Sequence, residues 1–243
     1  MFGVQSRVIA SITLRAAMGR KRALLFAITP LILLLVTTAI KLAHPVHTAW
    51  QGRVLGIFGF TVVLPLTALI IGTSVLGAEV DEGSIVHLLA TPVPRSVVIA
   101  TKYAVAVALT AVFVAVPELL AGLIATGGLT KLTVGLFAGA LAGSVMYNAI
   151  FVMLSVLTTR AIAYGLAYVL VWEGLLGNLV SGARLLSVGH YSLGVANGIA
   201  HDSALNPGLS VGTSAVMGTI VTALALVVAA RALSSFSLKG DAI

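Results

Sequence analysis

The sequence contains no cysteine and few charged residues. The absence of cysteine excludes disulfides, thiolate metal sites and a cysteine nucleophile. Only 9% of the 243 residues are charged and 59% are hydrophobic, whereas about a quarter of the residues in soluble domains are charged. The composition therefore predicts an all-helical integral membrane protein, and the length allows roughly six spans of about 20 residues each.

A phosphate-binding loop is also missing, because no Gly-x-x-x-x-Gly-Lys-Ser/Thr run occurs. The chain therefore has no P-loop ATPase site of its own. The net charge of +7 could indicate nucleic acid binding in a soluble protein. Here the charge is concentrated before the first predicted span, where basic residues hold a chain end in the cytoplasm. These residues are Arg7, Arg15, Arg20, Lys21 and Arg22.

Apolar runs predict spans at about 23–42, 54–77, 97–125, 132–157, 161–180 and 211–230. Residues 4–19, with Arg7 and Arg15 on one side, predict an amphipathic helix lying on the membrane surface. The segment 181–210 is rich in Gly, Ser and Asn, which favours short outer helices. With both termini inside, ten Lys and Arg residues fall on the cytoplasmic side and four outside. The outer four are Lys41, Arg53, Lys131 and Arg184, while Lys102 is expected to extend to the lipid headgroups.

The loop at 79–95 is unusual because it carries three acids, Glu79, Asp81 and Glu82, in an almost uncharged chain. Residues 83–90 can form a short helix with an apolar side, which Pro92 would end. Such a helix could dock into a groove of a partner protein. The pattern is equally compatible with a solvated helix lying against the membrane.

Two acids, Glu118 and Glu173, fall within predicted spans, and Trp172 precedes the second. A charge at the bilayer centre costs on the order of 2.5 to 3.5 kcal/mol, so such residues usually face a cavity or a partner. A substrate or proton site and a structural role in satisfying freed backbone groups are both compatible with these positions. A proton-coupled carrier using both acids is therefore an alternative function, although no internal repeat supports it.

Two further patterns suggest chemistry only weakly. His44 and His47 lack a third metal ligand nearby, so an ordinary outer loop is the favoured interpretation. Ser144 with His190 or His201 could suggest an intramembrane serine protease, but the serine lies in a row of small residues that packing explains. That row, Gly135, Gly139 and Gly143, predicts close helix contact within one subunit or between two.

The loop motif resembles that of type-2 ABC transporter permeases. The matching residues are Glu82, Gly83, Ser84, Leu88, Leu89, Pro92 and Arg95. Serine at position 84 departs from the usual threonine but keeps the hydroxyl group. The run 171–176 around Trp172 and Glu173 is similar to the fifth span of the same family, and residues 182–187 are similar to its outer helices.

The resemblance implies a permease subunit that pairs with a second permease chain, identical or different, and with two ABC ATPase subunits, which bind ATP and magnesium. No cofactor is expected in this chain. The expected location is the bacterial inner membrane, with both termini cytoplasmic, and the expected cargo is a lipid, a hydrophobic drug or a peptide antibiotic moved outward. The implied coupling helix contains Glu79, Asp81, Glu82, Gly83, Ser84, His87, Leu88, Leu89, Pro92 and Arg95. The pathway or gate is expected to include Glu118, Trp172, Glu173 and Tyr191. A further alternative to the transporter function is that the protein is a structural membrane scaffold.

Overall fold

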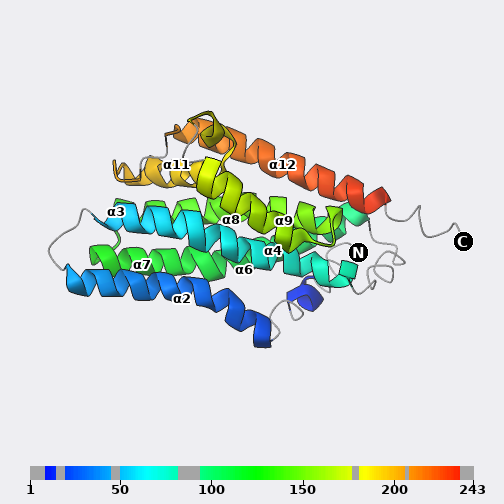
Figure 1. The fold of residues 1–243 in the computed structure, drawn as a ribbon, viewed down its shortest axis with the longest axis horizontal. Helices are drawn as coiled ribbons and strands as arrows, with labels where there is room; N and C mark the ends of the chain where they lie inside the picture. Colours follow the sequence, from blue (N-terminus) through cyan, green and yellow to red (C-terminus); the bar gives the residue numbers. More distant parts are fainter. Residues whose placement is uncertain are drawn as a thin grey trace, which may run out of the picture.

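The computed structural model describes residues 9–14, 20–44, 50–81, 94–176, 181–205 and 208–235. Every regular element within these ranges is a helix (Figure 1). A helix satisfies all of its backbone hydrogen bonds internally, as the water-free interior of a bilayer requires. The prediction of an all-helical fold is confirmed.

Five helical stretches are long and apolar enough to cross a bilayer. Three of them are single helices: α2 (Arg20–Ala43), α8 (Lys131–Leu157) and α12 (Val211–Ser235). The second stretch along the chain is a continuous run of α3 (Trp50–Val54), η1 (Leu55–Val63) and α4 (Leu64–Asp81). The third is a continuous run of α6 (Arg95–Thr110), η2 (Ala111–Ala115) and α7 (Val116–Thr126). Together with the hydropathy, these helices identify a multi-pass membrane protein.

The fifth predicted span corresponds to a shorter apolar helix. α9 (Ala161–Ala167) continues directly into η3 (Tyr168–Leu176), and the described part ends there. A sixth crossing therefore remains a prediction. Two short helices follow in the segment for which broken helices are predicted, η4 (Ser181–Leu186) and α11 (Val188–Ala200).

The second span is longer at both ends than its hydrophobic run predicts. It begins at Trp50, so Arg53 lies in helix α3 and not in an outer loop. It ends at Asp81, so Glu79 and Asp81 belong to the last turn of α4 and not to the following loop. A single glycine such as Gly77 costs a helix only about 1 kcal/mol, so helical hydrogen bonding continues past it.

Two π-helical segments each precede a proline. η1 ends just before Pro65, and η2 ends just before Pro117. Proline has no amide hydrogen and its ring collides with the preceding turn, so the backbone on its amino-terminal side departs from α geometry. The prolines thus explain why spans two and three are interrupted within their apolar regions.

Helix α8 lies at the centre of the bundle and contacts α4, α7, α11 and α12 (Figure 1). Its glycine row meets α11 of the same chain. A Cβ atom built on Gly139 would lie 2.7 Å from the carbonyl oxygen of Ser192, and one built on Gly135 would lie 2.5 Å from that of Ala196. The row therefore serves close packing within one subunit.

Hydrogen bonds between helices connect each end of the bundle. At one end, Lys41 Nζ and Gln51 Nε2 both donate to the carbonyl oxygen of Ala125, at 2.9 and 2.7 Å. At the other end, an Arg95 guanidinium nitrogen donates to the carbonyl oxygen of Leu233 at 3.2 Å. The start of α2 and the end of α12 lie at this second end, where Phe26 and Leu233 share one hydrophobic cluster.

Helical residues 9–14 lie beside α6, since Ala10 and Leu14 line a cavity together with Val105 and Val112. The remainder of the predicted surface helix, including Arg7 and Arg15, falls outside the described residues.

Candidate functional site

The most polar buried site surrounds Glu173, a residue of η3 with 4% of its surface exposed. Its Oε1 accepts hydrogen bonds from Tyr168 Oη and the amide of Val188, both at 2.8 Å. Its Oε2 accepts from Ser187 Oγ at 2.5 Å and from the amide of Gly189 at 3.3 Å. The carboxylate thus lies against the amino terminus of α11, where unpaired amides and the helix dipole favour negative charge.

Ser187 and His190 complete this helix terminus. Ser187 is the N-cap of α11, and its Oγ accepts from the His190 amide at 3.3 Å and lies 2.9 Å from His190 Nδ1. In a catalytic triad the carboxylate binds the histidine, whereas Glu173 here accepts directly from the serine. Ser144, the other serine considered as a nucleophile, donates to the carbonyl of Ala140 in its own helix. This geometry describes helix capping, not an activated nucleophile.

Two aromatic residues connect η3 and α11 to the short helix η4. Trp172 Nε1 donates to the carbonyl oxygen of Leu186 at 3.1 Å, and Tyr191 Oη donates to that of Leu185. Three residues expected at the gate, Trp172, Glu173 and Tyr191, therefore belong to one hydrogen-bonded unit. We call this unit, with Tyr168 and Ser187, the outer latch.

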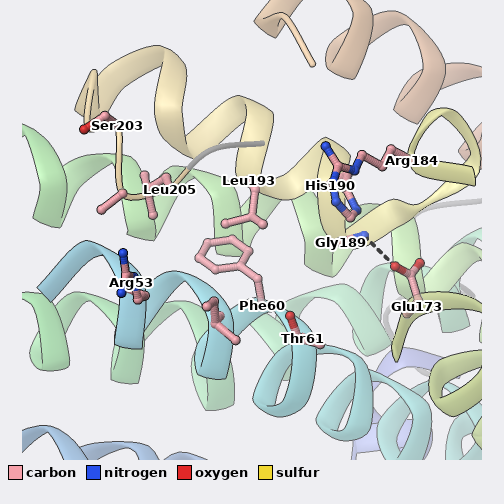
Figure 2. Close-up of a pocket in the computed structure, with 12 residues that line it drawn as sticks. Arg53, Phe60, Thr61, Glu173, Arg184, Gly189, His190, Leu193, Ser203 and Leu205 are labelled. Atoms are coloured by element: carbon pink, nitrogen blue, oxygen red, sulfur yellow. Dashed lines mark hydrogen bonds between the residues drawn. The ribbon is translucent and has the colours of Figure 1, made fainter. Parts of the chain in front are cut away.

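A pocket of about 570 Å³ adjoins the outer latch (Figure 2). Its lining combines basic residues with an apolar wall. The lining residues are Arg53, Ile57, Phe60, Thr61, Glu173, Arg184, Gly189, His190, Leu193, Ser203, Ala204 and Leu205. Figure 2 shows Arg184 and His190 at one end and Arg53 at the other, with Phe60 and Leu193 between them. Burial and the neighbouring Arg184 guanidinium lower the pKa of the His190 imidazole, which favours its neutral form.

Glu118 occupies a separate environment. It is 1% exposed, and neither of its carboxylate oxygens has a hydrogen-bond partner in the described part of the chain. It faces Gly59 of η1 so closely that a Cβ atom built on this glycine would lie 1.7 Å from Glu118 Oε1. Glu118 does not line the 570 Å³ pocket that Glu173 lines. The two acids named in the proton-carrier alternative therefore do not meet in that pocket.

The predicted coupling residues are only partly described. Glu79 and Asp81 lie on the last turn of α4, and Arg95 opens α6. Glu82, Gly83, Ser84, His87, Leu88, Leu89 and Pro92 fall outside the described residues.

The expectation for Lys102 was wrong. This lysine does not extend to the headgroups but is fully buried, and its Nζ donates to the carbonyl oxygen of Val75 at 2.8 Å. The reason is that α6 packs directly against α4, so the carbonyl oxygen of Val75 lies within reach of the ammonium group. Lys102 therefore connects the two helices that flank the predicted coupling loop.

Sequence reasoning did not identify several residues of the site. Ser187 had a recognisable signal, because a serine directly before an apolar helical run is a typical N-cap. Arg53 is predicted only as an outer charge, and Arg184 as an outer charge within the run that is similar to outer helices. Their common position on one pocket depends on how α3, η1, η4 and α11 pack around it.

Comparison with known proteins agrees with this architecture. A model of the ABC-2 family transporter protein matches residues 19–177, which is more than half of the chain. A comparison with curated protein sequences found no match. The matched region runs from the first helix through η3 and so includes both buried acids and the segment between α4 and α6. The chain belongs to the ABC-2 family of transporter proteins.

Proposed function

We propose that this chain is the membrane-spanning permease subunit of an ATP-driven exporter. Two permease chains form the pathway, and two separate ABC ATPase subunits bind ATP and magnesium. The stretch 79–95, which starts in the last turn of α4 and ends at the first residue of α6, is the coupling segment that contacts the ATPase. Both termini then lie in the cytoplasm, and the pocket beside the outer latch lies on the opposite side of the membrane. The family match supports the transporter class.

The observation that best supports coupling is the buried hydrogen bond from Lys102 Nζ to the carbonyl oxygen of Val75. It joins α6 to α4, the two helices between which residues 82–94 lie. A buried ammonium that donates to a carbonyl is difficult to separate from it, because breaking this hydrogen bond in an apolar environment is costly. Movement of the coupling segment would therefore displace α4 and α6 together.

ATP would then act by favouring one arrangement of the bundle over another. When the ATPase subunits close, they push the coupling segments, and α4 and η1 transmit the displacement toward the outer latch. The pathway changes from inward or lateral access to outward release. The substrate is hydrophobic or amphiphilic, in agreement with the apolar surface of the described spans.

Copurification tests this proposal directly. Glu82→Arg should reduce recovery of the ATPase subunit with the tagged chain and should lower the ATPase rate of the complex, because it reverses a charge in the coupling segment. Gly83→Pro should lower the rate further by altering the backbone. Lys131→Glu, a charge reversal at the other end of the bundle, is the control and should leave both measurements unchanged. Unchanged recovery and rate with Glu82→Arg would contradict the assigned contact.

The proton-coupled carrier is retained as a second candidate because Glu118 is a buried carboxylate without a partner in the described residues. Transport in proteoliposomes distinguishes the two. Transport that continues after the proton gradient is collapsed, and that stops when the ATPase subunit is omitted, eliminates the carrier.

A further inference from the structure

We propose that the pocket beside the outer latch binds an anionic amphiphile, whose negatively charged group is held by Arg184 and whose apolar part contacts Leu193 and Ile57. The pocket has a volume of about 570 Å³, within the usual range for small-molecule sites of roughly 300 to 1,000 Å³. The statement that this ligand is the transported cargo rests on the proposed function. Binding of the ligand to the pocket does not depend on that function.

Arg184 provides the strongest evidence for an anion. The side chain is half-buried, and its Nε is buried without a hydrogen-bond partner among the described residues. A buried donor without an acceptor is costly, so native structures rarely leave one without a ligand or water. The planar guanidinium matches the paired oxygens of a carboxylate or phosphate. A bound anionic group would satisfy this donor.

The acids near the pocket do not provide that acceptor. Glu173 already accepts four hydrogen bonds, two of them from the first amides of α11, so the helix terminus balances its charge. Asp202 lies at the other end, where its Oδ2 would be 2.7 Å from a Cβ atom built on Gly52. This carboxylate weakens the positive potential near Arg53. The anion is therefore assigned to Arg184, and Arg53 contributes a longer-range attraction.

The middle of the pocket is apolar. Phe60 and Leu193 separate Arg53 from Arg184 in Figure 2. Phe60 is almost fully buried, so the accessible apolar surface belongs to the half-buried Leu193 and to Ile57, which is 58% exposed. Apolar surface of this kind gains free energy when it is covered by an alkyl or aromatic group. A cationic drug would be repelled by the arginines, and a sugar would leave Leu193 and Ile57 without an apolar partner. An anionic group joined to an apolar body satisfies both regions.

Binding can be measured on the full-length chain in phosphatidylcholine nanodiscs, without ATP or an ATPase subunit. The probe is radiolabelled dodecyl phosphate, and dodecanol is the uncharged comparison. Wild type should retain dodecyl phosphate more strongly than dodecanol. Arg184→Gln should lower the affinity by about tenfold, which corresponds to the loss of one charge-assisted contact. Arg184→Lys should recover part of it, and Arg53→Gln should lower it by only about threefold.

Lys131→Gln is the matched control, because Lys131 is an exposed cation outside the pocket. It should bind as wild type does. Equal binding of dodecyl phosphate and dodecanol by wild type would overturn the proposal without any variant having to fold. An affinity for dodecyl phosphate that is unchanged in a monodisperse Arg184→Gln sample would also overturn the proposal. Neither result would affect the copurification test of the proposed function.

Added phosphatidylglycerol identifies the source of the anionic group. Competition with the probe in wild type, but not in Arg184→Gln, would support the proposal and identify a membrane lipid. Retained probe binding without competition would support the same chemistry and identify a free amphiphile.

Discussion

Replacing Glu173 by glutamine should open the outer latch. Within the described part of the chain, the carboxylate accepts four hydrogen bonds, from Tyr168, Ser187 and two amides of α11. An amide group of the same size keeps one accepting oxygen and turns an NH₂ group toward the remaining donors. Two accepted bonds are therefore lost in a site where only 4% of the Glu173 surface is exposed.

The expected loss follows from the number of bonds. Each hydrogen bond to a charged group contributes about 1.5 to 3 kcal/mol, so two amount to roughly 3 to 6 kcal/mol. Water from the adjoining pocket can replace part of the lost hydrogen bonding. The free energy of unfolding is therefore expected to decrease by about 3 kcal/mol. Tyr168→Phe removes one donor and leaves the carboxylate, so it should cost about half as much, roughly 1.5 kcal/mol.

Equilibrium unfolding in mixed micelles, with dodecyl sulfate as denaturant, measures this difference. Trp172 is a local fluorescence reporter because its Nε1 donates to the carbonyl of Leu186 in η4. In the Glu173→Gln variant, the Trp172 signal should change at lower denaturant than the helical circular dichroism signal, because the latch opens before the bundle unfolds. Stability within about 0.5 kcal/mol of wild type, with an unchanged Trp172 transition, would refute this reasoning.

Two further contacts give predictions at other positions. Gly59→Ala should destabilise the chain by about 2 kcal/mol through overpacking, because the new methyl group would lie 1.7 Å from Glu118 Oε1. Glu118→Ala in the same background should restore most of this loss, whereas Gly128→Ala, at an open position, should have little effect in the same unfolding assay. Lys102→Met should increase hydrogen exchange in the last turns of α4, because it removes the bond between α6 and α4. Hydrogen-exchange protection of α4 equal to that of wild type would contradict the proposed connection between α4 and α6. Lys131→Met, which changes an exposed lysine, is the control.

The sequence was sufficient to predict the helical class and the two buried acids. A long apolar run that crosses a bilayer forms a helix, because a helix satisfies its own backbone hydrogen bonds. An acid within such a run is easily recognised because charged residues are rare there. The partners of Glu173 were not predictable in the same way, since the amides that bind it belong to a helix that begins fifteen residues later, at Val188. Which helix end approaches a given side chain depends on packing, not on local pattern.

Lys102 illustrates the same limit at the other end of the bundle. A lysine near the start of a span usually reaches the headgroups, and nothing in its neighbours argues otherwise. Burial follows from the packing of α6 against α4, which places the carbonyl of Val75 2.8 Å from Nζ. The local pattern around the lysine does not show which helix packs against it.

The second span physically connects the two functional regions. Residues Trp50–Asp81 form one continuous helical run, with Arg53 lining the 570 Å³ pocket and Glu79 and Asp81 on its last turn at the opposite end. Its only departure from α geometry is η1, which also contributes Phe60 to the pocket and Gly59 to the contact with Glu118. A rigid helix moves as a unit, whereas a π-helical segment can change its hydrogen-bond register. We therefore expect displacement of α4 by the coupling segment to be absorbed at η1, where it alters the pocket wall and the space available to Glu118. Spin labels on a cysteine pair spanning η1, introduced into this cysteine-free chain, should report a distance change with ATP, while a pair within α4 should not.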